Sequence, residues 1–131
     1  MRQVLAEVAE GVRSVVEADF LDLIKRSRLP VPLLNAQLYS ADGTFITRPD
    51  AWWPQAGVAA EVDSRQWHLR PADWERTMNR HARMSSHGII VLHFTPRQIR
   101  ASPAQVTTAI ADALKSGSAR PPLAVVTRRA S

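Results

Sequence analysis

The chain has 131 residues, a formal net charge of +5 and no cysteine. At this length a single domain buries roughly two-thirds of its unfolded surface and needs no disulfide or structural metal. The lack of cysteine excludes disulfide frameworks, thiolate zinc sites and cysteine nucleophiles. No apolar run approaches the ~20 residues of a membrane span, and the N-terminus does not resemble a secretory signal. We therefore expect a soluble, cytoplasmic protein that does not enter a membrane.

The charge is unevenly distributed along the chain. Residues 1–63 carry six basic and nine acidic side chains, whereas residues 64–100 carry seven arginines and two acids. Fifteen of the seventeen basic residues are arginine, which suits bidentate contacts with phosphate but is also what a biased genome composition would give. The charge thus favours a polyanionic partner, DNA or RNA.

The N-terminal region predicts a long helix from about Arg2 to Arg28, because its apolar residues recur at helical spacing and two prolines follow. Within it, Ser14 and Glu17 have the spacing of a capping box. A second interpretation of Glu17 is that it points from the apolar stripe toward acidic residues later in the chain. The apolar stripe consists of Val12, Val16, Phe20, Leu23 and Ile24.

Three strands are expected next. Residues 33–39 and 44–52 read as two strands of a hairpin, since Asp-Gly stands between them, and Pro49 places the second strand at an edge or bulge. Residues 58–63 form the third strand. Side chains alternate along a strand, so Glu61 and Asp63 share one face with Ala59 while Val58, Ala60 and Val62 pack the other.

A second helix is predicted from Pro71 to about Ser85, with two distinct sides. Its inner side is expected to hold Trp74, Met78, His81, Ala82 and Ser85. The opposite side carries Arg76, Arg80 and Arg83, which form either a solvated face or a surface that follows a phosphate backbone. The four tryptophans, at positions 52, 53, 67 and 74, suit the core and rim of the fold or the stacking of bases.

The remaining sequence predicts a strand, a helix and a tail. Residues 89–94 are nearly all apolar, as expected at the centre of a sheet, with His93 as a core histidine. A helix begins near Pro103, and residues 116–131 read as a flexible tail. The order of elements gives an α/β fold in which a mixed four-stranded sheet carries helices on both faces, within a single domain of residues 1–115.

The acidic residues of this fold have the form of a metal site. Asp50 is followed after ten residues by Glu61-Val62-Asp63. Carboxylate oxygens suit Mg²⁺ or Mn²⁺, and such a metal polarises a phosphate and lowers the pKa of an attacking water. The alternative is that Asp50 caps or turns the chain while Glu61 and Asp63 pair with arginines.

These residues resemble the PD-(D/E)XK nuclease superfamily, most nearly its very-short-patch-repair-endonuclease-like domain of unknown function. The resemblance covers roughly Val12 to Leu114. It is carried by Ser14-x-x-Glu17, Leu29-Pro30-x-Pro32, Pro49-Asp50, Glu61-Val62-Asp63, His68, the helix around Asp73 and Arg76, residues 88–95 and the helix after Pro103.

The resemblance implies a restriction-endonuclease-like core with Asp50 and Glu61 as the metal-binding pair and Glu17 as an auxiliary ligand. The superfamily has a lysine where this chain has Asp63, so the group that orients the attacking water is absent or comes from elsewhere. Asp63 is then a further metal ligand or a hydrogen-bonding residue at the end of the strand. His68 follows the third strand where related sequences also tend to carry histidine. It would assist proton transfer or contact the scissile phosphate, or it is a structural ring in the loop.

Two functions follow as hypotheses. The first is a Mg²⁺-dependent DNA endonuclease that uses Asp50, Glu61, Asp63 and His68. The second is an inactive nuclease fold that binds nucleic acid through its arginines or regulates a partner. The sequence is compatible with a homo-oligomer and with a fragment whose targeting depends on a domain or partner outside this chain.

Overall fold

The computed structural model describes residues 15–63 and 71–129, which form two β-sheets and four α-helices. The four-stranded sheet has the order β1-β4-β5-β6, with β1 (Leu33–Leu34), β4 (Ala51–Trp53), β5 (Val58–Val62) and β6 (Ile90–Phe94). The three-stranded antiparallel sheet has the order β3-β2-β7, with β2 (Gln37–Ser40), β3 (Phe45–Thr47) and β7 (Val125–Arg128). The helices are α2 (Val15–Arg26), α3 (Pro71–Ser86), α4 (Pro96–Ala101) and α5 (Pro103–Ser118).

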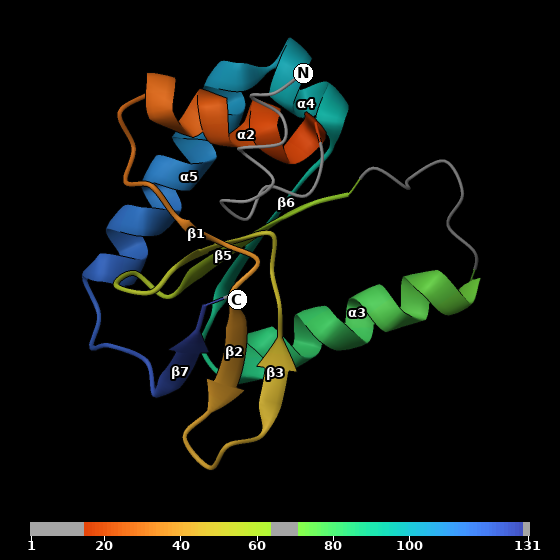
Figure 1. Cartoon of the computed structure of the whole chain (residues 1–131), viewed down its shortest axis with the longest axis vertical. Coiled ribbons are helices and arrows are strands. Elements are labelled where there is room, and N and C mark those ends of the chain that lie inside the picture. Colours follow the sequence, from red (N-terminus) through yellow and green to blue (C-terminus); the bar gives the residue numbers. More distant parts are fainter. Residues whose placement is uncertain (1–14, 64–70, 130–131) are drawn as a thin grey trace.

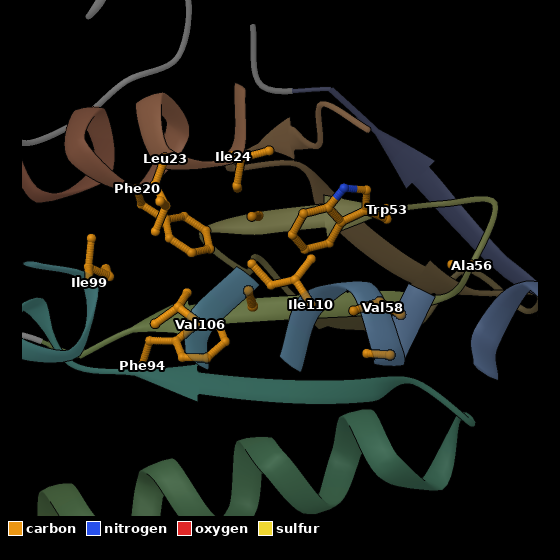
Figure 2. Close-up of a cluster of buried hydrophobic side chains, with 13 residues drawn as sticks. Phe20, Leu23, Ile24, Trp53, Ala56, Val58, Phe94, Ile99, Val106 and Ile110 are labelled. Carbon is orange, nitrogen blue, oxygen red and sulfur yellow. The ribbon is translucent and has the colours of Figure 1, made fainter. Parts of the chain in front are cut away.

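The four-stranded sheet separates two apolar layers (Figure 1). On one face, α2 and α5 bury side chains such as Phe20 and Ile110 against Trp53, as Figure 2 shows. On the other face, Met84 of α3 and Leu38 of the three-stranded sheet belong to a second buried cluster. The predicted mixed four-stranded sheet with helices on both faces is confirmed, and the three-stranded sheet shares one of those faces with α3.

Each strand of the predicted hairpin divides between the two sheets. The first strand breaks at Asn35, whose φ of 56° is in the left-handed region, and the second breaks at Pro49, which has no amide donor. Beyond these breaks, β2 and β3 pair around the expected Asp42-Gly43 turn, while β1 and β4 pair in the other sheet. The backbone at Asp50 therefore lies where the chain passes between sheets.

The alternation predicted for residues 58–63 is confirmed in β5. Val58 and Ala60 belong to the cluster under α2 and α5, whereas Ala59 belongs to the cluster on the α3 face. Glu61 therefore projects from the same face as Ala59. The first helix, as far as the structure describes it, begins at Val15, and residues 1–14 of the predicted helix lie outside the described residues.

The position of β6 in the sheet corrects the prediction. Among the described strands, β6 pairs only with β5, in parallel, and lies at the edge of the four-stranded sheet, not at its centre. Its apolar composition has another cause: α5 contacts it from one face and α3 from the other. A strand covered on both faces is apolar throughout, whether or not it is central.

The C-terminal residues also differ from the prediction of a flexible tail over 116–131. Residues 116–118 complete α5, and Val125–Arg128 form β7, which pairs with β2. Thr127 Oγ1 accepts a hydrogen bond of 2.9 Å from the buried Trp52 indole nitrogen. A strand of four residues has little local signal, and its long-range pairing with β2 supplies the order.

None of the described helices is long and apolar enough to cross a membrane.

Gly117 on α5 provides a test of this packing. A Cβ at that position would lie 2.1 Å from the carbonyl oxygen of Ala56, in the turn before β5. Alanine ordinarily stabilises a helix interior relative to glycine. Here we expect Gly117→Ala to lower the free energy of unfolding by about 1–3 kcal/mol, as overpacking does.

Urea denaturation measures this difference, with Ser118→Ala on the exposed side of the same helix as the control. A Gly117→Ala protein as stable as the wild type would contradict the close approach of α5 to the β4–β5 turn.

Candidate active site

The predicted acids meet in one cleft of about 250 Å³ at the ends of β4 and β5. The strand register explains their proximity. Ala51 lies opposite Ala60 in the antiparallel β4–β5 pair, which places Asp50 next to Glu61, and Glu61 lies beside His93 in the parallel β5–β6 pair. The lining residues are Glu17, Asn35, Arg48, Asp50, Glu61, Val62, Asp63, Thr77, Arg80 and His93.

Glu61 is the most buried carboxylate of the cleft, with 7% of its surface exposed. Arg80 of α3 approaches it, and the distance from Nε to Glu61 Oε1 is 3.1 Å. The two atoms are buried and close, but neither makes a hydrogen bond of good geometry. Burial raises the pKa of Glu61 to about 7; Arg80 opposes this shift, and the nearby Asp50 and Asp63 reinforce it. The carboxylate is therefore costly to ionise in this position.

Two hydrogen bonds fix the position of Asp50, just before β4. Its Oδ2 accepts a hydrogen bond of 2.7 Å from the amide of Val62, and its carbonyl oxygen accepts one of 3.2 Å from the amide of Asn35. The first bond fixes the carboxylate against the end of β5. The second bond joins the two segments, at Asn35 and Asp50, in which the chain passes from one sheet to the other. The position of Asp50 therefore depends on both sheets.

Glu17 reaches the cleft from α2, as its second interpretation predicted. Its Oε1 accepts a hydrogen bond of 3.1 Å from Asn35 Nδ2. Ser14, the other half of the predicted capping box, lies outside the described residues. Asn35 was not predicted as a site residue, although a polar residue directly after the apolar Leu33-Leu34 was a signal in the sequence. The structure buries this side chain, where it needs hydrogen-bond partners.

The other two predicted catalytic residues are Asp63 and His68. Asp63 lines the cleft, and its amide donates a hydrogen bond of 2.9 Å to the carbonyl of Phe94 just beyond β5. This contact continues the β5–β6 pairing by one residue. His68 falls in residues 64–70, outside the described residues, so its predicted role stays a prediction.

His93 is a site residue that the sequence interpretation assigned to the core. It lines the cleft, it is exposed on β6, and its Nε2 lies 3.1 Å from Nδ1 of His81. The ring centroids are 5.3 Å apart, so the two rings meet edge to edge across a hydrogen bond. Burial, reinforced by His81 and Arg80, lowers the pKa of His93. The signal was available: His93 is the one polar residue of an apolar strand.

The predicted arginine stripe of α3 does not form one surface. Arg76 pairs with Asp73 on the exposed side of the helix, and Arg83 Nε donates a hydrogen bond of 3.1 Å to the carbonyl of Ile46. Arg80 instead turns into the cleft toward Glu61. Arg48, which was not predicted, lines the same cleft, and its place two residues before Asp50 was the available signal.

The arrangement supplies two neighbouring carboxylates and two arginines in one cleft. Among residues 15–63 and 71–129, no three His, Asp or Glu side chains are grouped so as to hold a metal ion by themselves. Mg²⁺ commonly uses only one or two protein carboxylates together with waters and phosphate oxygens. Asp50 and Glu61 are the pair that could serve in this way, and Arg48 and Arg80 can contact a phosphate.

Comparison with known proteins gives relatives without an assigned function. Two uncharacterized proteins of Mycobacterium tuberculosis, MT2308 and Rv2248, are each 28% identical to the chain over 108 residues. The match covers 82% of this chain and 40% of each relative, so the chain spans well under half their length. No protein-family model and no solved structure matches the chain.

The raised pKa of Glu61 predicts how stability depends on pH. The folded state favours the protonated carboxyl, so this stabilisation is complete below the ordinary value of 4.5 and is lost as the pH rises through about 7. We expect Glu61 to lower the free energy of unfolding by up to about 3 kcal/mol over that range. Glu61→Gln, which does not titrate, removes this dependence.

Urea denaturation of both proteins at a series of pH values tests the expectation, because the histidines titrate in both and cancel in the difference. Asp112→Asn, an exposed change on α5, should keep the wild-type pH dependence. Parallel curves for the wild type and Glu61→Gln would mean that the carboxylate is not perturbed.

Proposed function

We propose that this chain is a Mg²⁺-dependent DNA endonuclease domain with a restriction-endonuclease-like core. The observation that carries the proposal is the pairing of Asp50 with Glu61, a buried carboxylate with a raised pKa, in a cleft that also holds arginines. The mixed four-stranded sheet with helices on both faces supports such a core at a coarser level. The resemblance to PD-(D/E)XK nucleases agrees with the same two acids.

The residues present fit a divalent cation. Glu61 is buried, and Arg80 Nε lies 3.1 Å from its Oε1 without a hydrogen bond of good geometry, so the carboxylate gains from a cation that is better placed. The ligands on offer are hard carboxylate oxygens, which Mg²⁺ and Mn²⁺ prefer. Asp50 and Glu61 would hold the ion, and Glu17, which also lines the cleft, would serve as an auxiliary ligand. When bound, the ion polarises the scissile phosphate and lowers the pKa of a water.

The other residues of the cleft bind and orient the substrate. Arg80, which faces Glu61, and Arg48 at the rim would contact the phosphate of the strand. Asp63 stands where the superfamily has lysine, and as a residue that lines the cleft it would orient the attacking water. We infer that targeting of the whole protein depends on a domain or partner outside this chain, since both relatives are longer.

Cleavage and metal binding can be tested together. We expect the protein to nick supercoiled plasmid in Mg²⁺ or Mn²⁺, and Asp50→Asn or Glu61→Gln to reduce the rate at least 100-fold, as loss of a ligand that acts in the transition state does. Separately, Mg²⁺ at 100 times its dissociation constant should stabilise the wild type by about 2.7 kcal/mol.

Asp112→Asn is the matched control, because it removes a carboxylate from an exposed helix surface. It should leave both nicking and stabilisation unchanged. Equal nicking by the wild type and both cleft variants would indicate contamination, and stabilisation by Mg²⁺ that persists in Glu61→Gln would refute the metal assignment.

A second candidate is favoured by the Arg80–Glu61 contact. An arginine already neutralises the key acid, and lysine is missing at Asp63, as in a nuclease fold that binds nucleic acid without cutting it. This candidate predicts binding that weakens steeply with salt, survives Glu61→Gln and falls in Arg48→Ala. Fluorescence anisotropy with a labelled duplex across a salt series measures it. Cleavage by the wild type that Glu61→Gln abolishes would exclude this candidate.

A further inference from the structure

A second cavity, of about 440 Å³, adjoins the acidic cleft. The two cavities share Asp63, Thr77 and His93, so they lie side by side. Their chemistry differs, because the cleft is lined mainly by acids and arginines, whereas the second cavity is lined mainly by aromatic rings, two imidazoles and Met78. Its lining residues are Asp63, Trp74, Thr77, Met78, His81, His93, Phe94 and Thr95, which we call the Trp74 groove.

Two apolar residues of the Trp74 groove, Trp74 and Met78, belong to neither buried cluster of the described residues, whereas Phe94 at its base is part of the core. Trp74 and Met78 are 53% and 48% exposed, although their spacing predicted the inner side of α3. Among the described residues of α3, Met84 is the one that is buried. The helix instead turns Thr77 and Arg80 toward the cleft. Trp74 and Met78 are thereby left at the rim of the groove, with their large side chains exposed among the described residues.

Polar groups complete the groove. His81 and His93 meet edge to edge, and Thr77 and Thr95 add hydroxyls to the lining. A flat aromatic face beside hydrogen-bonding groups is the combination that recognises a nucleobase, which stacks on its face and bonds along its edge. A folded protein partner would need a much larger apolar surface than this groove offers.

We propose that the Trp74 groove binds an unpaired nucleobase of the DNA strand whose phosphate enters the adjoining cleft. The proposal rests on the proposed function only in placing a nucleic-acid phosphate in that cleft. The adjacency of the two cavities argues for this occupant, because a base and its phosphate belong to one nucleotide and lie close together. The substrate class is then single-stranded DNA or DNA with an unpaired base, since a base within a duplex cannot reach the groove.

The test measures base recognition in EDTA, without metal or cleavage. Fluorescence anisotropy gives the affinity of the full chain for a labelled single strand, for an abasic strand of equal length and charge, and for the matched duplex. We expect the wild type to prefer the base-containing strand over the abasic strand roughly tenfold or more, the effect of stacking on one aromatic ring. Trp74→Ala should abolish the preference, and Trp74→Phe should keep most of it.

Val126→Ala is the control, because Val126 is 48% exposed on β7 and lies outside both cavities. It should bind all three DNAs as the wild type does, and circular dichroism verifies that each variant is folded. A wild type that binds the base-containing and abasic strands equally overturns the proposal, as does an equal loss of affinity for both in Trp74→Ala. Self-association that Trp74→Ala abolishes, without base preference, would make the groove a contact between copies.

These outcomes separate the groove from the nuclease. Base preference in EDTA together with no metal-dependent nicking would support base binding in the Trp74 groove and refute the endonuclease proposal. Nicking that depends on Glu61 together with no base preference would support the endonuclease proposal and refute base binding in the Trp74 groove.

Discussion

The burial of Glu61 is the constraint on which the site depends. An ionised carboxylate in the interior is costly unless a cation meets it. The fold places this carboxylate on β5, between an antiparallel and a parallel neighbour, and turns Arg80 toward it from α3. The neighbouring Asp50 raises the cost further. The cleft is therefore a place where a further cation would relieve an existing electrostatic strain.

The geometry around that residue follows from two interruptions of the chain. Asn35 lies between β1 and β2, and Pro49 lies between β3 and β4. At each of these two breaks the chain passes from one sheet to the other, and polar groups are left at the ends of the strands. Asp50 is held there by Val62 and Asn35. Breaks of this kind cost ladder hydrogen bonds, and they place side chains where continuous strands could not.

Local patterns were sufficient for much of this arrangement. The period of two along β5 predicted which face carries Glu61, and the Asp42-Gly43 turn predicted the β2–β3 hairpin. What escaped prediction depends on distant partners. The strand β7 is ordered by pairing with β2, and the rotation of α3 is set by packing of its C-terminal half through Met84. Helical spacing alone gave Trp74 the inner side, because periodicity does not specify what the facing surface needs.

The proposed mechanism requires that Asp50 and Glu61 together form one cation site. Anomalous diffraction from crystals grown with Mn²⁺ tests this most directly, because the ion locates itself without reference to activity. The account predicts a peak within about 2.0–2.4 Å of a carboxylate oxygen from each residue, with Arg80 moved away from Glu61. Crystals in which the cleft shows no peak, and Arg80 still contacts Glu61, would contradict it.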